Sequence, residues 1–310
     1  MTSRRVAEKQ KVTPPWLKKR LAPGSVHETF SSLLSKTQIH TVCQEAQCPN
    51  IWECFSRKTA TFMIMGNHCT RNCRFCAVAH GPNRPPDPEE PARIAGMVQN
   101  LNLDYVVITS VTRDDLPDGG ASFFVRTVKE IRRKVPDALV ELLIPDFRGN
   151  KDALKSITEV QPDVLNHNIE TVPRLYTIVR PEAIYQRSLN LLMQVVTFDS
   201  TIITKSGLML GLGEQPEEII NTLKDLLNAG CQLVTMGQYL QPTKTHLPVE
   251  RYIPPKEFDN WRKIALKMGF VEVAGGPFVR SSFNAKKLYR TVKAFTPSSS
   301  DSRNKTPLTL

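Results

Sequence analysis

The sequence predicts an α/β fold in which parallel strands alternate with helices and curve into part of a TIM-like barrel. Short apolar runs alternate with amphipathic segments from residue 61 onwards, and the turns between them are short. This order is typical of parallel strands joined by helices. The candidate strands are 61–65, 104–110, 138–144, 163–169, 207–212 and 232–238. These six strands are too few for a complete eight-stranded barrel, so we expect a partial (β/α)6 barrel with N- and C-terminal extensions.

Two of the segments between the strands have clear helical periodicity. In 120–135, apolar residues recur at steps of three and four residues. The segment 216–229 repeats this pattern, begins with Pro216 and stops at Gly230, as helix ends commonly do. Both segments are therefore predicted to be helices.

Length and composition indicate one large domain with small additions. The chain has 310 residues, of which 40% are hydrophobic and 23% charged, as is ordinary for a globular protein. No apolar run approaches the roughly 20 residues that a membrane-spanning helix needs, so no membrane association is expected. Many thiols without an export signal indicate the reducing cytoplasm. We expect an N-terminal arm at 1–60, the barrel at 61–270 and a C-terminal extension at 271–310.

The net charge of +11 is concentrated at the two ends of the chain. Residues 1–40 hold eight Lys and Arg against two Glu, and residues 280–310 hold seven against one Asp, which leaves the middle at −1. One interpretation is a pair of solvated tails, which we favour for 296–310. The other is a basic collar that steers an acidic macromolecule towards the site. Charge alone would also suit nucleic acid.

Six of the seven cysteines lie within a short stretch and form two triplets. The first triplet has the spacing C-x4-C-x5-C and the second C-x3-C-x2-C. Three thiolates can hold three corners of a cubane iron–sulfur cluster, which leaves one iron open for chemistry. The alternative is structural zinc, which needs four ligands, commonly in C-x2-C-like pairs, and which His40, His68 or His80 could complete. The triplets are Cys43, Cys48 and Cys54, and then Cys69, Cys73 and Cys76; the seventh cysteine, Cys231, is expected to be a buried structural thiol.

The strand order predicts where the second triplet lies. In barrels of this kind the chemistry occurs at the carboxyl ends of the strands. The second triplet directly follows the first predicted strand, so it belongs to the mouth of the barrel. The same rule selects the loops 109–115, 166–170 and 211–214.

The cysteine motifs also carry a resemblance to a known family. The second triplet, with Phe75 before its last cysteine, resembles the signature of radical S-adenosylmethionine (SAM) enzymes. The first triplet, together with the segment Arg280-Ser281-Ser282-Phe283, is similar to the lipoyl synthase family within them. The likeness extends from Pro15 to about Ala285, and it implies a partial radical SAM barrel. One departure is Phe283, where the family has tyrosine, so any hydrogen bond from that phenol is missing.

The resemblance implies a reaction and its cofactors. Two sulfur atoms would be inserted at C6 and C8 of an octanoyl group attached to a lysine of a carrier domain. The cofactors would be SAM and two 4Fe–4S clusters, one of which binds SAM at its open iron and one of which donates its sulfur. Because the C–H bonds are unactivated, a radical route is physically reasonable.

The resemblance also assigns residues to these roles. The second triplet would hold the SAM-binding cluster, and the first triplet with Ser282 would hold the auxiliary cluster. Ser282 is chosen over Ser281 by position alone. The implied contacts to SAM are Phe75 at the adenine, Asn168 and Glu170 at the ribose, and Thr112, Arg113 and Glu214 near the methionine end. The plain alternative is that polar residues at strand ends cap the following helices.

Partners follow from the same resemblance. They are an octanoylated lipoyl carrier domain or the glycine cleavage H protein, both acidic, a reduced ferredoxin or flavodoxin, and a carrier that repairs the cluster. A tRNA methylthiotransferase is the second hypothesis, but only about 25 polar residues follow the barrel, and the basic aromatic strand pattern of RNA-binding sheets is missing. A non-catalytic zinc module for nucleic acid is the third.

Overall fold

The computed structural model describes residues 13–18, 39–45, 48, 50, 53 and 61–295. The side chain of Cys43, all of Cys54 and the tail 296–310 lie outside the described residues. The predictions that concern them are therefore not examined by the structure.

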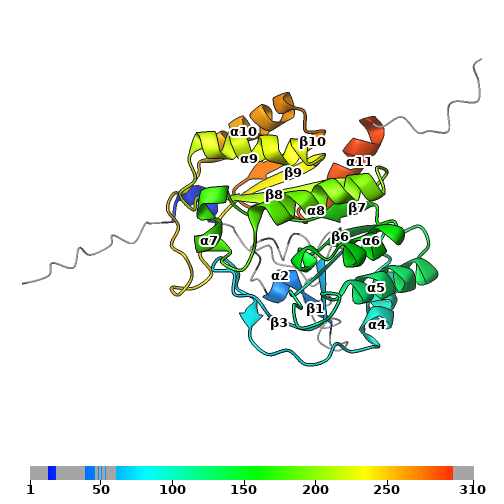
Figure 1. The fold of residues 1–310 in the computed structure, drawn as a ribbon. Helices are drawn as coiled ribbons and strands as arrows, with labels where there is room; N and C mark the ends of the chain where they lie inside the picture. Colours follow the sequence, from blue (N-terminus) through cyan, green and yellow to red (C-terminus); the bar gives the residue numbers. More distant parts are fainter. Residues whose placement is uncertain are drawn as a thin grey trace, which may run out of the picture.

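Parallel strands form the centre of the described part of the chain (Figure 1). Its main sheet has the strand order β1-β2-β5-β6-β7-β8-β9-β10, in which β1 is antiparallel to β2 and all other neighbours are parallel. These strands are β1 (His40–Thr41), β2 (Thr61–Ile64), β5 (Tyr105–Ser110), β6 (Leu139–Leu143), β7 (Val164–Asn166), β8 (Ile203–Leu210), β9 (Leu233–Gln238) and β10 (Glu272–Gly276). A small separate sheet pairs β3 (His68–Cys69) with β4 (Ala79–His80).

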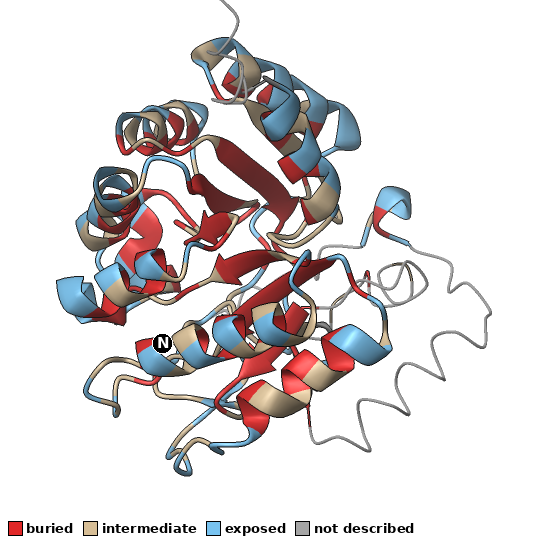
Figure 2. Cartoon of the chain, turned by 90° about the vertical axis from the view of Figure 1, so that its right-hand side faces the viewer, coloured by how far each residue is buried: buried red, intermediate tan, exposed pale blue. Residues whose placement is uncertain are grey.

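Helices follow the strands and cover the outer face of the sheet. Figure 2 shows buried residues along the strands and on the helix sides that face them, with exposed residues on the outer sides. The helices are α2 (Val42–Glu45), α4 (Glu90–Asn100), α5 (Ala121–Lys134), α6 (Lys151–Glu159), α7 (Tyr176–Val179), α8 (Tyr185–Phe198), α9 (Pro216–Asn228), α10 (Pro255–Met268) and α11 (Ala285–Phe295), with 3-10 turns η1 (Pro15–Leu17), η2 (Phe147–Gly149) and η3 (Pro173–Leu175). Within this described part, no helix combines the length and apolar character needed to cross a bilayer.

The predicted α/β class and its strand series are confirmed. All six predicted strands form, and the predicted helices at 120–135 and 216–229 are α5 and α9. The structure adds the parallel strand β10, which the sequence analysis did not find because its residues include two adjacent glycines. β10 lies beyond residue 270, where we expected the C-terminal extension, and it continues the sheet at the β9 edge.

Helix α11 lies at the amino ends of the strands. Its Leu288 and Val292 pack with Val107 and Val164 in a small core separate from the larger one between the sheet and the outer helices. Figure 1 accordingly shows α11 at the opposite end of the sheet from α7. The lysines of this helix therefore do not surround the mouth of the barrel. The expectation of a basic collar at the site is wrong for residues 285–295, because burial of the apolar face of the helix decides where it packs.

Candidate active site

The second cysteine triplet occupies the loop after β2, as predicted. The chain turns at Met65 and Gly66, both with positive φ (67° and 89°), and then enters β3 with Cys69. The small β3–β4 sheet closes the base of the loop, where the Gly81 amide donates to the carbonyl of Cys69 at 3.1 Å. All three thiols of the triplet are partly buried.

The loop after β5 holds this cysteine loop in place. The thiol sulfur of Cys69 accepts hydrogen bonds from the amides of Arg71 (3.4 Å) and Thr112 (3.3 Å). Thr112 also accepts the amide of Thr70 at its carbonyl, at 3.0 Å. Amides that point at a ligand sulfur stabilise the thiolate and tune a cluster bound to it. Thr112, predicted as a SAM contact, thus supports the cysteine loop through its backbone.

The loop after β9 contacts the other end of the cysteine loop. His246 Nε2 lies 2.9 Å from the carbonyl oxygen of Cys76, and the Leu247 amide donates to the carbonyl of Arg74 at 3.2 Å. His246 belongs to none of the motifs recognised in the sequence. The signal that could have found it is the rule on carboxyl ends, which applies to the sixth predicted strand as it does to the others.

Arg180 brings a positive charge to the cysteine loop, and it was not predicted. Its guanidinium donates through Nη1 to the carbonyl of Asn168 at 3.1 Å. Burial raises the pKa of the Glu170 carboxyl, and the charge of Arg180 opposes that rise. Burial likewise raises the pKa of the Cys73 thiol, again opposed by Arg180. Arg180 therefore faces both the cluster loop and the residues predicted to bind ribose.

The chemistry of the three thiols fits an iron–sulfur cluster. Burial, with a smaller contribution from the neighbouring Cys73 and Cys69, raises the pKa of Cys76 to about 12. Thiols in this setting stay protonated unless a metal compensates their charge. Among the described residues, no three Cys, His, Asp or Glu side chains could hold a single metal ion together. Three thiols in one loop are the ligand set that a cubane cluster with one open iron requires.

Two buried polar atoms beside the loop lack hydrogen-bond partners among the described residues. Asn168 Oδ1 and Arg180 Nε are buried and have no hydrogen-bond partner within the described part of the chain. Buried polar atoms in proteins are otherwise almost always hydrogen-bonded. Both atoms lie with Glu170 at the carboxyl end of β7, where the resemblance implies SAM.

The Arg-Ser-Ser segment packs against the concave face of the sheet. A Cβ atom at Gly237 of β9 would lie 2.1 Å from the carbonyl oxygen of Val279, so the segment needs glycine there. Asn50 Nδ2 donates to the carbonyl of Phe278 at 2.6 Å, which ties the region of the first triplet to the same segment. Burial lowers the pKa of Arg280, and negative charge on Cys48 or Glu170 would oppose this. Its guanidinium thus lies near both.

The other residues predicted to contact SAM already have partners within the protein. Arg113 is 1% exposed, pairs with Asp115 at 2.7 Å and also donates to Met65, so its guanidinium has protein partners. The Glu214 carboxylate accepts the amides of Gly211 and Leu212, at 2.5 and 2.9 Å, so it braces its own loop, while Gln215 and Glu218 cap the following helix α9. Phe75 packs on the core. Their contacts with SAM stay predictions. Cys231 is 2% exposed, as expected.

Comparisons with known proteins agree with this geometry. The Radical SAM superfamily profile matches residues 63–226. A protein named lipoyl synthase from Desulfotalea psychrophila is 57% identical over 277 residues, which cover 89% of this chain and 93% of that protein. Another lipoyl synthase, from Chlorobium phaeovibrioides, is 57% identical over 88% of this chain and 96% of its own.

Solved structures agree on the fold alone. The crystal structure of Streptococcus suis SuiB bound to the precursor peptide SuiA superposes with a TM-score of 0.55 at 12% identity. The match covers 84% of this chain, which spans about half (55%) of the length of SuiB. At this identity the likeness supports the barrel architecture and carries no information on substrate.

Proposed function

The chain belongs to the lipoyl synthase family of the Radical SAM superfamily, and we propose how its residues divide the work of sulfur insertion. The family inserts two sulfur atoms at C6 and C8 of a protein-bound octanoyl group. It uses SAM and two 4Fe–4S clusters, and it acts on lipoyl-carrier proteins.

The first part of the proposal places SAM at the mouth of the barrel. Cys69, Cys73 and Cys76 hold one cluster, whose remaining iron is open to SAM. When bound, these cofactors supply the one-electron chemistry that opens an unactivated C–H bond. The side chains of Asn168 and Arg180, whose Oδ1 and Nε have no hydrogen-bond partner among the described residues, position the polar parts of SAM. The packed helices around the sheet exclude water from the other sides.

The second part assigns the auxiliary cluster to Cys43, Cys48, Cys54 and Ser282. Support comes from the contacts that tie residue 50 to the Arg-Ser-Ser segment and from the position of Arg280 near Cys48. A serine oxygen is a harder ligand than a thiolate and a poorer partner for a cluster iron. A cluster held in this way releases iron more readily, which suits a sulfur donor.

The third part concerns organisation and partners. We propose an arm at 1–60 that carries the auxiliary cysteines, a barrel at 61–270 and an extension at 271–310. The substrates are the glycine cleavage H protein or another octanoylated carrier domain in the cytoplasm. A reduced ferredoxin or flavodoxin delivers electrons, and a separate carrier rebuilds the auxiliary cluster. The measurement that decides the substrate is mass spectrometry of an octanoylated carrier after one anaerobic turnover.

One observation carries the proposal. The loop of three thiols, whose charges affect one another's pKa, lies beside Arg180 and Glu170 at the strand ends. Replacing Cys73 by alanine should abolish both 5′-deoxyadenosine formation and sulfur insertion. Replacing Cys48 by alanine should spare deoxyadenosine formation and end sulfur insertion. Cys231→Ala, which removes a thiol far from the loop, should retain both. Equal loss of SAM cleavage in the first two variants at normal folding would overturn this division.

A further inference from the structure

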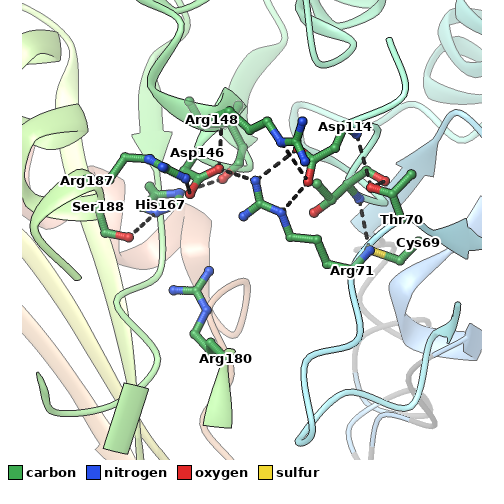
Figure 3. A network of polar contacts seen from close by, with 12 residues as sticks. Cys69, Thr70, Arg71, Asp114, Asp146, Arg148, His167, Arg180, Arg187 and Ser188 are labelled. Atoms are coloured by element: carbon green, nitrogen blue, oxygen red, sulfur yellow. Dashed lines mark hydrogen bonds and ion pairs between the residues drawn. The ribbon is translucent and has the colours of Figure 1, made fainter. Parts of the chain in front are cut away.

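A buried network of charges lies behind the cysteine loop (Figure 3). Its centre is Arg71, which stands between Cys69 and Cys73 in the sequence and is 5% exposed. The guanidinium donates to both carboxylate oxygens of Asp114, at 2.6 and 3.0 Å, and to Asp146 Oδ1 at 2.6 Å. The loop after β2 is thereby fastened to the loops after β5 and β6.

Asp146 extends the network to helix α8. It is 2% exposed and lies 3.2 Å from Nη1 of Arg187 through its second oxygen. Burial alone would raise the pKa of Asp146, but the hydrogen bond and charge of Arg71 outweigh it and hold this pKa well below its usual range. Arg148 lies 3.6 Å from Asp114 at the outer end of the network. Three arginines therefore face two aspartates, a net charge of one positive.

The turn that carries Asp146 is strained. Phe147 and Arg148 have φ of 45° and 51°, a left-handed conformation that is unfavourable for residues other than glycine. Phe147 is buried and packs edge-on against Phe124, with ring centroids 6.3 Å apart. A Cβ atom at Gly119 would lie 2.9 Å from the Phe147 ring. Close packing on both sides thus holds a turn that places one carboxylate under the cysteine loop.

Stability alone does not account for this arrangement. Burying an ion pair costs so much desolvation that a well-packed apolar replacement is commonly neutral or stabilising. A strained turn adds to that cost. The network is more easily understood as a device that fixes charge and position beside the cysteines. Arg71 is well placed for this, because its own amide donates to the sulfur of Cys69.

We propose that Arg71 is a positioning residue for the SAM-binding cluster, and that its pairing with Asp146 sets the local charge that this cluster experiences. The inference rests on the proposed function of Cys69, Cys73 and Cys76. Net charge and hydrogen bonds to the sulfurs are among the determinants of a cluster's reduction potential. Removing the positive charge of Arg71 should lower the potential, because the reduced cluster carries one more negative charge. Removing the negative charge of Asp146 should raise it.

The test compares charge variants of the holoenzyme under anaerobic conditions. The variants are Arg71→Met, Asp146→Asn, the double variant, and Arg71→Lys, with Arg133→Met as control because Arg133 pairs with Glu130 on the surface. The readout is the midpoint potential of the paramagnetic signal that changes when SAM is added. A second readout is the rate at which a chelator removes iron.

We expect the potential to fall in Arg71→Met, to rise in Asp146→Asn and to return close to that of the unmodified protein in the double variant. Arg71→Lys keeps the charge but loses the planar fork, so its potential should stay while iron is lost several times faster. Arg133→Met should change neither readout. A merely structural network would not produce shifts of opposite sign.

Two results would overturn the inference. One is a shift of the same sign in Arg71→Met and Asp146→Asn. The other is that Asp146→Asn and Arg71→Lys both keep the potential and the iron-loss rate of the unmodified protein. This second comparison does not need Arg71→Met, so it still decides the question if that variant fails to take up iron. If the unmodified protein loaded with clusters shows no signal that responds to SAM, the proposed function of the three cysteines falls first, and this inference with it.

Discussion

The side-chain amide of Asn168 donates a hydrogen bond of 2.9 Å to the hydroxyl of Ser281. The same amide donates to Glu170 at 3.0 Å, so Ser281 is joined to the group of residues predicted to bind SAM. The side chain of Ser282 is half-buried, and its hydroxyl has no hydrogen-bond partner within the described residues. In the sequence, only position distinguishes Ser282 from Ser281 as the cluster ligand. In the structure the two serines also differ in their surroundings.

This difference predicts separate defects for the two serines. Ser282→Ala should remove the fourth ligand of the auxiliary cluster and end sulfur insertion, while 5′-deoxyadenosine still forms. Ser281→Ala should keep insertion and weaken SAM binding about fivefold, since it removes a hydrogen bond worth about 1 kcal/mol. Mass spectrometry of the carrier and equilibrium binding of SAM measure the two effects. Loss of insertion in Ser281→Ala alone would assign the ligand to Ser281.

A second prediction concerns Gly237, where the Arg-Ser-Ser segment crosses the sheet. In Gly237→Ala the new methyl would lie 2.1 Å from the carbonyl oxygen of Val279, so the segment must move. Overpacking of this kind costs about 1–3 kcal/mol of stability. We expect sulfur insertion to fall at least tenfold, and SAM cleavage to fall less, because the displaced segment carries Ser282.

The control for this variant is Gly96→Ala in helix α4. A Cβ atom at Gly96 would meet only the end of the Lys134 side chain, at 3.4 Å. Alanine in a helix interior is favoured over glycine by about 1 kcal/mol, so this variant should be as stable or slightly more stable. Equal losses of insertion and cleavage in Gly237→Ala would show that the segment does not act on the auxiliary cluster separately.

Local patterns were sufficient to predict six strands of the main sheet and the position of the cysteine loop, but not β10. Buried parallel strands appear as short apolar runs, and the carboxyl ends of such strands meet at one edge of the sheet. The pattern failed at the start of β8, which begins at Ile203 and not at Gly207. Lys205 interrupts the apolar run there, and only the structure shows that Glu141 pairs with it.

The missed residues depend on contacts that no local pattern contains. Arg180, Asp146 and His246 act on the cysteine loop through partners far away in the sequence. Helix α11 was misplaced for a related reason. Its charges were visible in the sequence, but the strand ends on which its apolar side packs were not. Composition reports how many charges an element has and not which end of a barrel it closes.

A third prediction concerns the buried pair of Lys205 and Glu141 inside the barrel. Lys205 Nζ lies 2.8 Å from the carboxylate, which also accepts hydrogen bonds from Tyr105 at 2.6 Å and Asn166 at 3.0 Å. Lys205→Met would leave a buried carboxylate without its counter-charge and cost about 3–5 kcal/mol of stability. Adding Glu141→Gln, which removes the charge but keeps an acceptor for Tyr105 and Asn166, should restore most of that loss. Denaturant unfolding at pH 7 measures both, and a loss that the second change does not relieve would contradict the argument.

A fourth prediction separates the two basic ends of the chain in carrier binding. Lys286 pairs with Asp104 at the amino end of β5, far from the mouth of the barrel. Neutralising Lys286 and Lys287 should therefore leave the affinity for an octanoylated carrier unchanged. Neutralising Lys18 with the neighbouring Lys19 and Arg20, which lie outside the described residues, should weaken binding and reduce its salt dependence. Binding titrations at low and high salt test this. Equal affinities of the two variants at both salt concentrations would rule out a basic collar at the N-terminal end.

The last prediction concerns pH and His167, a buried histidine at the end of β7. Nδ1 lies 2.8 Å from the carbonyl oxygen of Ile144, and Nε2 lies 2.9 Å from the hydroxyl of Ser188. Burial lowers the pKa of His167 to about 4, whereas an unfolded chain has a histidine pKa of about 6.5. Below that value the unfolded state binds a proton that the folded state refuses.

The stability contributed by neutral His167 is therefore complete above about pH 6.5 and is lost as the pH falls towards 4. Linkage gives a loss of about 2 kcal/mol between pH 7 and pH 5 from this one group. In His167→Gln the free energy of unfolding should fall less over this range, by about that amount, whatever its value at pH 7. Denaturant unfolding of both proteins at the two pH values measures the difference, in which the contributions of all other groups cancel. Equal slopes in the two proteins would show that His167 accepts a proton in the folded state as easily as in the unfolded one.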